Sequence, residues 1–444
     1  MRRRSFLAAT VAASVVGTVG ATVAVNRPWS APATAVAPQH SGAARHVILI
    51  DWDGVAPGYL DALFAAGELP VLRALADNGG RSTVSCSYKA ISNPNRSSLA
   101  TGAWPAIHRN TAYVLAPDTG RAIGQTRRLD AETIAQSLRR QNRTVLAAGW
   151  YIVQKRGSDY GDPAGLYTQS ESWEETVDAV VGVLRGEAVR SGWRGVRMRR
   201  IPDLIAAYTA DVDAIGHREG PDSPRVRERL LALDTGLGRI VDAARWAGIA
   251  EQTTFAFVSD HGMTGYTETL EPAVLGAIRH AGFSVERLYS GHLPLAETEV
   301  VLTASPRAAN VYLRGRAATA AGRAQLAEIL AGLDELEGVH DREHLDALGA
   351  APEEGDFVIE ARPPYAFLDP AAVDGRTRGG HASAREGHAP LILAGAGIRP
   401  GHQLRQATIV DVAPTLSHLL GAAPPAHAQG RVLEEALEDI SSFE

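Results

Sequence analysis

The stretch His46-Val-Ile-Leu-Ile-Asp-Trp-Asp-Gly54 decides the fold of this chain of 444 residues. Its apolar run from Val47 to Ile50 is typical of a strand that is buried on both faces of a sheet. Four similar runs follow, at 144–148, 204–207, 254–258 and 390–394. Between the runs lie segments with helical spacing, such as 225–245, in which apolar residues recur every three or four positions. This alternation predicts an α/β fold with a doubly wound, mostly parallel sheet that helices flank on both faces.

The segment 290–374 breaks the alternation. It contains three strand-like runs and one helix-like run, at 299–303, 310–313, 356–360 and 317–333. We therefore predict a smaller, cap-like α+β insertion at 290–374 and a core domain formed by 45–289 and 375–444. A chain of this length with 45% hydrophobic residues is able to bury a large core.

The N-terminal residues are typical of an export signal. Arg2, Arg3 and Arg4 precede an apolar stretch that runs from 8 to about 25, and small residues follow it. We predict a twin-arginine-type signal peptide at 1–37 and a linker at 38–44, with an uncleaved membrane anchor as the alternative. The signal implies the twin-arginine export machinery as the partner of the precursor. It also implies a secreted or extracytoplasmic location, in the periplasm or cell-wall space, and no stable membrane span in the mature chain.

The composition excludes several classes of function. The formal net charge of −6 and the pI of about 6.2 do not favour binding to a nucleic-acid duplex through general electrostatics. Cys86 is the single cysteine, so an internal disulfide and a cysteine-based metal site are excluded.

Acidic and histidine side chains occur close to the predicted strand ends. These candidate ligands are Asp53, Asp213, His217, Asp260, His261 and His381. In an open parallel sheet, residues at the carboxyl ends of strands meet at one edge, where ligands bind. Each of them alone has a structural alternative, such as a turn at Asp53-Gly54 or a helical face at Asp213 and His217. Together they predict a site for Zn²⁺ or a similar divalent ion.

Ser92 is the candidate nucleophile. It begins the segment Ser92-Asn-Pro-Asn-Arg-Ser-Ser-Leu-Ala-Thr-Gly102, and Pro94 is typical of the first turn of a helix. A hydroxyl at that position lies at the positive end of the helix, where free N–H groups also bind anions. The alternative is that Ser92 is an ordinary N-cap.

These segments resemble the alkaline phosphatase superfamily and, within it, the type I phosphodiesterase/nucleotide pyrophosphatase branch. The pieces that carry the resemblance are 50–54, 92–102, Tyr208–Pro221, Ser259–Gly262 and Gly380-His381, spread over about 46–400. The resemblance implies an alkaline-phosphatase-like fold, a metal-dependent hydrolase core and a small-molecule phosphate ester as substrate.

The resemblance also implies roles for single residues. Asp213, His217 and His381 would hold one of two divalent ions, for which zinc is the expected identity. Asp53, Asp260 and His261 would hold the other, and Ser92 would form a phosphoseryl intermediate. Asn110 would bind the substrate phosphate if the chain carries a short deletion there, whereas strict spacing places Tyr113 at that position.

Departures from the family pattern leave the substrate open. Relatives that cleave diesters usually have Thr where this chain has Ser92. Some monoesterases bind phosphate with a Lys-x-Arg pair, where this chain has Trp150-Tyr151. We therefore expect phosphodiesters or nucleotide pyrophosphates as substrates. The alternatives are a phosphomonoesterase of the alkaline phosphatase type, a phosphonate hydrolase, a sulfatase of the Ser92-x-Pro94-x-Arg96 type and a metal-dead binding module.

Overall fold

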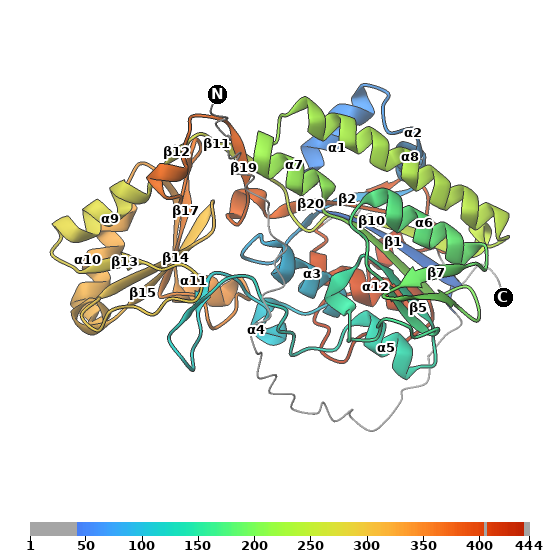
Figure 1. Ribbon diagram of the computed structural model, residues 1–444, viewed down its shortest axis with the longest axis horizontal. Helices are drawn as coiled ribbons and strands as arrows, with labels where there is room; N and C mark the ends of the chain where they lie inside the picture. Colours follow the sequence, from blue (N-terminus) through green and yellow to red (C-terminus); the bar gives the residue numbers. More distant parts are fainter. Residues whose placement is uncertain (1–41, 404–405, 439–444) are drawn as a thin grey trace, which may run out of the picture. The chain divides into compact units, whose positions relative to one another are not determined.

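The computed structural model describes residues 42–403 and 406–438 (Figure 1). The predicted signal peptide at 1–37 and most of the predicted linker at 38–44 lie outside the described residues. The described residues all belong to one compact unit of the chain.

The centre of the fold is an eight-stranded sheet formed by the described residues, in the order β21-β2-β20-β10-β1-β9-β5-β6. The strands are β1 (His46–Trp52), β2 (Gly79–Ser85), β5 (Val145–Ala148), β6 (Gly165–Thr168), β9 (Leu204–Thr209), β10 (Thr253–Val258), β20 (His388–Gly395) and β21 (His402–Gln403). β1 lies parallel to β9 and β10, with Val47 opposite Leu204 on one side and Thr254 on the other. β20 runs antiparallel to both of its neighbours. The predicted mostly parallel sheet is confirmed.

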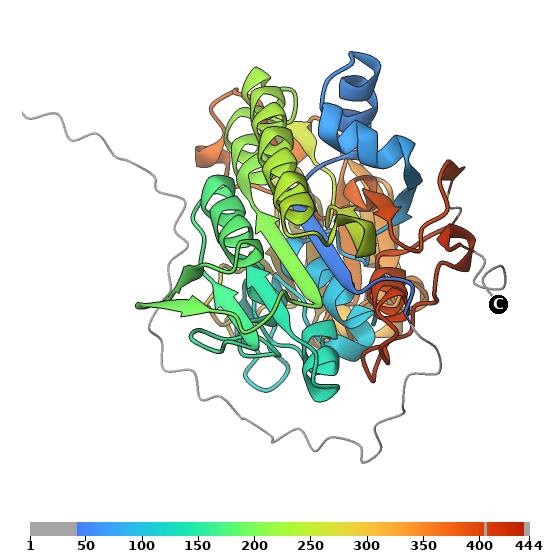
Figure 2. The same cartoon turned by 90° about the vertical axis from the view of Figure 1, so that its right-hand side faces the viewer.

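Helices cover both faces of this sheet, because the side chains of each strand alternate between the faces. Val47 and Leu49 of β1 pack with α3 (Ser92–Thr101), α5 (Ile134–Arg140) and α12 (Val412–Leu419). Ile48 and Ile50 point to the opposite face, towards α1 (Pro57–Ala65), α2 (Pro70–Asp77), α6 (Trp173–Leu184) and α8 (Pro224–Trp246). Figure 2 shows β1 in blue with the green helices α6 and α8 on one side and the red α12 on the other.

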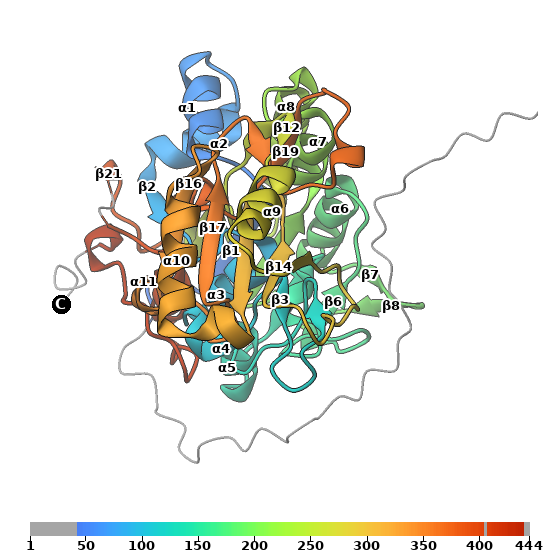
Figure 3. The same cartoon turned by 90° about the vertical axis from the view of Figure 1, so that its left-hand side faces the viewer.

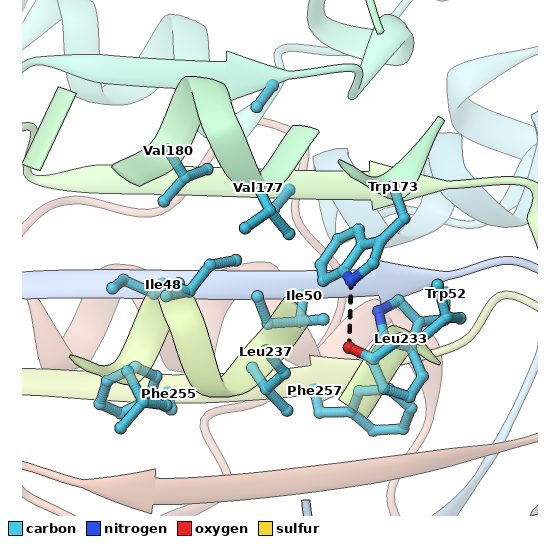
Figure 4. Packing of buried hydrophobic residues seen from close by; sticks show 14 of the residues in the cluster. Ile48, Ile50, Trp52, Trp173, Val177, Val180, Leu233, Leu237, Phe255 and Phe257 are labelled. Carbon is cyan, nitrogen blue, oxygen red and sulfur yellow. Dashed lines mark hydrogen bonds between the residues drawn. The ribbon is translucent and has the colours of Figure 1, made fainter. Parts of the chain in front are cut away.

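The layer that contains α6 and α8 is held by large aromatic side chains. Trp52 makes edge-to-face contacts with Trp173, at 5.9 Å between ring centroids, and with Phe257, at 4.9 Å. The indole N–H of Trp173 donates to the carbonyl of Leu233 in α8 at 3.0 Å (Figure 4). This bond satisfies the polar atom of a buried tryptophan and ties α6 to α8.

A second sheet of five strands, β13-β14-β15-β17-β16, forms within the described part of the chain (Figures 1 and 3). Its strands are β13 (Val285–Arg287), β14 (Val300–Ala304), β15 (Ala308–Leu313), β16 (Leu336–Asp341) and β17 (Phe357–Ala361). One face packs against α9 (Glu271–His280) and α10 (Ala320–Ala331), and α11 (Arg342–Ala347) follows β16. The predicted fold class, a doubly wound α/β core with a smaller α+β part, is confirmed. The exact domain boundaries stay a prediction.

Short elements connect the two sheets. β11 (Thr264–Tyr266) pairs with β19 (Arg378–Gly380), and β12 (Glu268–Thr269) pairs with β18 (Tyr365–Ala366). These pairs return the chain from the second sheet to the edge of the first, directly before His381. Among the helices of the described residues, none has the length and apolar character that crossing a bilayer requires.

Candidate metal centre

The six predicted ligands meet at the carboxyl end of the main sheet. Asp53 follows β1 directly, and Asp260 and His261 follow β10. Asp213 and His217 are four residues apart in α7 (Asp211–Glu219), so they share one helical face. We call Asp213, His217 and His381 the outer group, and Asp53, Asp260 and His261 the inner group.

The two groups lie close to each other at Gly54, which follows Asp53 and packs against Asp213. Gly54 has φ +72°, and a Cβ atom there would lie 3.0 Å from the Cβ of Asp213. A side chain at this position would therefore be strained in its backbone and would crowd the Asp213 side chain. Glycine allows the turn that carries Asp53 to lie directly against α7.

In the outer group, both histidines direct Nε2 at the same carboxylate oxygen. Nε2 of His217 lies 3.3 Å from Oδ1 of Asp213, and Nε2 of His381 lies 3.6 Å from it. The Nδ1 atoms donate to backbone carbonyls, from His217 to Gly379 at 2.9 Å and from His381 to Ala90 at 2.8 Å. These bonds place the proton of each neutral ring on Nδ1, so Nε2 faces the cluster and presents a lone pair whenever the ring is neutral.

The inner group has the same arrangement with more complete burial. Nδ1 of His261 donates to the carbonyl of Gly262 at 2.9 Å, and its Nε2 lies 3.2 Å from Oδ2 of Asp260 and 3.5 Å from Oδ1 of Asp53. The rings of His261 and His381 stack at 3.7 Å between centroids, which places the two groups side by side.

The cluster leaves buried acceptors without donors. Oδ1 of Asp53 and Oδ1 of Asp213 have no hydrogen-bond partner among the described residues, although both atoms are buried, and Oδ2 of Asp260 has an ion pair with Arg96 but no hydrogen bond there. Single ligand atoms of Asp213, His217 and His381 lie within 4.8 Å of one another, as do those of Asp53, Asp213 and His261. Buried acceptors that face one another are costly unless a cation lies between them. The residues therefore fit divalent metal ions.

Charge and burial set the protonation of the cluster in the absence of an ion. Burial lowers the pKa of His261 to about 4 and, together with the charge of His261, that of His381 to about 3. Burial also lowers the pKa of His217, but the charge of Asp213 outweighs it and raises that pKa to about 9. Burial raises the pKa of Asp53 and of Asp260. His261 and His381 are thus neutral at pH 7, the form that ligates metal.

Ser92 lies at the start of α3 and points at the inner group. The N-cap of α3 is Ile91, and the Ser92 side chain makes no capping bond, so the interpretation of Ser92 as an ordinary N-cap is wrong. Its hydroxyl lies 3.0 Å from Nε2 of His261. Because Nδ1 of His261 already carries the proton, Ser92 is the donor of this hydrogen bond.

Arg96 is the residue that sequence reasoning missed. It lies one turn after Ser92 in α3 and is fully buried. Its Nε donates to Oδ2 of Asp51 at 2.9 Å, and its Nη2 lies 3.0 Å from Oδ2 of Asp53 and 3.1 Å from Oδ2 of Asp260. The indole of Trp150 donates to the same oxygen of Asp51 at 3.0 Å. The spacing of four residues from Ser92, which places both side chains on one helical face, was the signal available in the sequence.

Asn110 and Tyr113 lie in different surroundings. The amide nitrogen of Asn110 donates to the carbonyls of Thr126, at 3.2 Å, and Arg128, at 2.8 Å, so its N–H groups hold the neighbouring loop. Burial raises the pKa of the Tyr113 phenol, and the charge of Asp213 raises it further. The binding of phosphate by Asn110 or by Tyr113 stays a prediction.

Comparison with known sequences identifies related proteins. Residues 47–384 match the family model described as type I phosphodiesterase/nucleotide pyrophosphatase. An ectonucleotide pyrophosphatase/phosphodiesterase of Caenorhabditis elegans is 26% identical over 227 residues, which cover 49% of this chain and 26% of the relative. The human ectonucleotide pyrophosphatase/phosphodiesterase family member 7 is 21% identical over 252 residues, which cover 53% of this chain and 51% of the relative. The matches thus cover about half or less of the relatives' length.

Solved structures show the same fold. Human ectonucleotide pyrophosphatase/phosphodiesterase 5 superposes with a TM-score of 0.68 at 18% identity, covering 89% of this chain and all of that chain. An inactive variant of its murine counterpart, in complex with AMP, superposes with a TM-score of 0.67 at 19% identity and the same coverage. At these identities the likeness concerns the fold alone.

Proposed function

This chain belongs to the type I phosphodiesterase/nucleotide pyrophosphatase family, and on that premise we propose that it hydrolyses small phosphodiesters or nucleotide pyrophosphates at the Asp/His cluster. The observation that carries the proposal is the meeting of buried acceptors in the outer and inner groups. Carboxylate oxygens and histidine lone pairs face one another there, and a Ser hydroxyl lies against them.

We assign two divalent ions to the cluster, with zinc as the expected metal. Asp213, His217 and His381 would hold one, and Asp53, Asp260 and His261 the other. Oxygen and nitrogen ligands of this kind suit Zn²⁺. When bound, the ions supply positive charge that favours the ionised form of Ser92 and stabilises charge developing on the phosphate oxygens.

The chain's own residues supply the nucleophile and its orientation. The Ser92 hydroxyl loses its proton to solvent and Oγ attacks phosphorus; the bond from phosphorus to the leaving oxygen breaks, the leaving oxygen takes up a proton from solvent, and the serine carries the phosphoryl group. Water then cleaves the Oγ–P bond and restores Ser92. The N-terminal end of α3, a helix of ten residues, directs its free N–H groups and positive end at the incoming phosphate.

The residues after β5 favour substrates with a single negative charge on the reacting phosphate. Trp150 is fully buried and donates to Asp51, and the hydroxyl of Tyr151 donates to Oδ1 of Asn93 at 2.6 Å. Neither side chain supplies the positive charge that a monoester dianion requires. A nucleotide diester or pyrophosphate fits this site better, and the solved murine relative in complex with AMP is consistent with a nucleotide as the ligand class.

The remaining alternatives differ in the bond that is cleaved. A phosphomonoesterase, a phosphonate hydrolase or a sulfatase would use much the same part of the sheet edge. A metal-dead binding module would lack one or more ligands, whereas this chain has an aspartate or a histidine at each of the six predicted positions. We also propose export of the chain through the signal at 1–37.

The test compares initial rates of the Zn²⁺-loaded chain on p-nitrophenyl phosphate, bis-p-nitrophenyl phosphate and a nucleotide p-nitrophenyl ester. Wild type is measured beside Ser92→Ala and the matched control Ser97→Ala. Ser97 lies in the same helix and donates to the carbonyl of Asn93, away from the cluster. We expect faster cleavage of the diesters, a loss of about 10³-fold or more in Ser92→Ala, and a change of only a few-fold in Ser97→Ala.

Other outcomes identify the alternatives. Preference for the monoester would indicate a phosphatase. Activity retained in Ser92→Ala would remove the serine from the mechanism. Two bound ions without activity on any of the three esters would contradict the proposal and favour phosphonates, sulfates or a binding role.

A further inference from the structure

A basic hairpin projects from the main sheet at the edge formed by β6. β7 (Ala188–Ser191) pairs antiparallel with β8 (Arg194–Arg197), and Gly192-Trp193 forms the two-residue turn between them (Figure 3). Gly192 has φ +60°, as a tight hairpin turn requires. The hydroxyl of Ser191 donates to the carbonyl of Tyr167 in β6 at 2.6 Å and accepts from the amide of Gly161 at 3.0 Å, so the hairpin is anchored near its turn.

The hairpin and the residues after it are strongly cationic. The segment 188–200 contains five arginines and no acidic residue, in a chain whose net charge is −6. Arg200 pairs with Asp203 at 3.0 Å. Arg194, Arg197 and Arg199 are exposed, and none has an ion-pair partner in the part of the chain that the structure describes.

Trp193 at the tip is the most exposed large apolar side chain among the described residues. Its exposed fraction is 100%, against 68% for Trp246. A tryptophan with this exposure among the described residues contributes little to folding from its large apolar surface. Its position between two strands that carry arginines indicates a surface that becomes covered by a partner.

One side of the hairpin borders an acidic cleft of about 530 Å³, whose lining includes Arg190 of β7 and Gly192 of the turn. The carboxylates in its lining belong to Glu171, Glu175, Asp178 and Glu187. An anionic partner is repelled by this cleft and attracted by Arg194 and Arg197, so it approaches the hairpin at the tip from the side that β8 forms.

We propose that the tip of this hairpin docks on the surface of an anionic lipid bilayer. The indole of Trp193 enters the interfacial layer, where tryptophan is enriched in membrane-bound proteins. Arg194, Arg197 and Arg199 lie at the level of the lipid phosphates and add electrostatic attraction. One tryptophan and three arginines give weak, reversible association and do not anchor the chain permanently.

The shape of the tip favours a bilayer over a nucleic acid. A nucleic acid is bound along a groove that follows its backbone, with aromatic side chains on which bases stack in succession. The hairpin tip is a narrow projection with one aromatic residue, and it lies at the opposite strand edge from β2 and β21. The inference is independent of the proposed hydrolysis, because no residue of the hairpin belongs to the metal cluster.

The test measures co-sedimentation of the full chain with vesicles of phosphatidylcholine alone and of phosphatidylcholine with an equal amount of phosphatidylglycerol. The hairpin variant is W193S/R194S/R197S. The matched control W246S/R239S/R245S also removes one exposed tryptophan and two exposed arginines, from α8. The N-terminal segment is the same in all three proteins, so differences between them report on the hairpin.

We expect binding to the anionic vesicles that is at least about 25-fold weaker in the hairpin variant, since each arginine near a membrane contributes about fivefold. The control variant should bind the anionic vesicles as strongly as wild type does. Added salt should weaken the binding of both proteins. Hydrolysis of a soluble ester should be equal in all three proteins, which shows that the hairpin variant is folded.

Three results would overturn the inference. The first is equal binding to both kinds of vesicle, and the second is unchanged binding by the hairpin variant. The third is hairpin-dependent binding to a DNA oligonucleotide, or hairpin-dependent dimerisation in light scattering, without binding to vesicles. That result would assign the tip to a nucleic acid or to a second copy of the chain.

Discussion

The outer group lies at the accessible end of the cluster, where the side chain of His217 is 35% exposed, whereas the side chains of Asp260 and His261 in the inner group are 0% exposed. The outer carboxylate, Asp213, faces two histidines. The inner carboxylates face one histidine and the guanidinium of Arg96. Both groups contain aspartate and histidine. In the outer group the titratable His217 neutralises the carboxylate, whereas in the inner group the permanent cation Arg96 neutralises the carboxylates.

Because of this difference, the inner group can be buried during folding without a metal ion, whereas the charge of the outer group depends on protonation or on an ion. Arg96 supplies positive charge to Asp51, Asp53 and Asp260 whether or not an ion is bound. The inner carboxylates can therefore be buried during folding before metal is present. The outer group has no such cation, so its charge balance depends on the protonation of His217 or on an ion. We expect the outer ion to exchange more readily.

Replacing Arg96 should have the largest effect on stability. Arg96→Met leaves three buried carboxylates without their cation, and loss of one partner of a buried ion pair costs about 3–5 kcal/mol. The loss should be large in metal-free protein and smaller in Zn²⁺-loaded protein, because the ions replace part of the missing charge. Urea unfolding with and without Zn²⁺ measures both values.

Arg307→Met is the matched control for this prediction. Arg307 is also fully buried and pairs with Glu337 and Glu386, neither of which is one of the six ligands. Its loss should destabilise the chain equally with and without Zn²⁺. If Arg96→Met behaves in the same metal-independent way, then Arg96 does not balance the charge of the inner group.

Removing one histidine from each group should separate the two ions. His217→Ala should lose the outer ion and His261→Ala the inner one, each with a fall in affinity of about 100-fold. Extraction of zinc from wild type by a chelator should show a fast and a slow phase. Only the slow phase should remain in His217→Ala, and only the fast phase in His261→Ala. A single phase in wild type that both variants accelerate equally would mean that the groups act as one site.

Gly54→Ala should disturb the contact between the two groups. The substitution places a methyl group 3.0 Å from the Cβ of Asp213 at a φ of +72°. We expect a loss of about 1–2 kcal/mol in stability and weaker binding of both ions. Gly67→Ala is the control, because Gly67 has φ +73° and nothing within 4 Å of an added Cβ. Unchanged zinc affinity in Gly54→Ala would show that the contact does not position Asp213.

His108 provides a reference for a buried histidine outside the metal cluster, and replacing it should have the smallest effect of these changes. Burial lowers the pKa of His108 to about 3. The unfolded chain therefore binds the extra proton below about pH 6.5, and stability falls as the pH decreases towards 3. Between pH 6.5 and 5 this amounts to about 1.5 kcal/mol.

The measurement is the free energy of unfolding against pH in His108→Gln and wild type, with both ions bound. The variant should have the shallower acid slope, and His280→Gln, on the exposed side of α9, should not differ from wild type. Identical slopes in His108→Gln and wild type would mean that His108 is protonated in the folded chain.

The sequence predicted the parts of the fold that depend on local pattern. The apolar run at His46–Ile50 and its four counterparts became β1, β5, β9, β10 and β20, and the helical spacing at 225–245 became α8. β2 was not predicted, because Gly79–Ser85 is mostly polar and becomes a strand by pairing with β20 and β21. The antiparallel direction of β20 was not readable either, since a buried strand has the same composition in both directions.

The candidate site likewise has features that the local sequence pattern predicted and features that it did not. The positions of Asp53, Asp260 and His261 after apolar runs were sufficient to predict that they meet. The carbonyls of Gly379 and Ala90, which orient His217 and His381, belong to segments that no local pattern connects with those histidines. Asn110 was chosen by assuming a short deletion, since strict spacing gives Tyr113, and its amide holds the loop at Thr126 and Arg128.

By itself the sequence determined where strands and helices form, because these elements follow from the short-range periodicity of apolar side chains. It thereby also determined which residue types stand at the strand ends. Only the tertiary structure decided which carboxylate oxygens remain without hydrogen-bond donors among the described residues, that Arg96 is the cation beside them, and that Trp193 is fully exposed there. Burial and charge pairing depend on residues far apart in the sequence, and the folded chain alone brings those residues together.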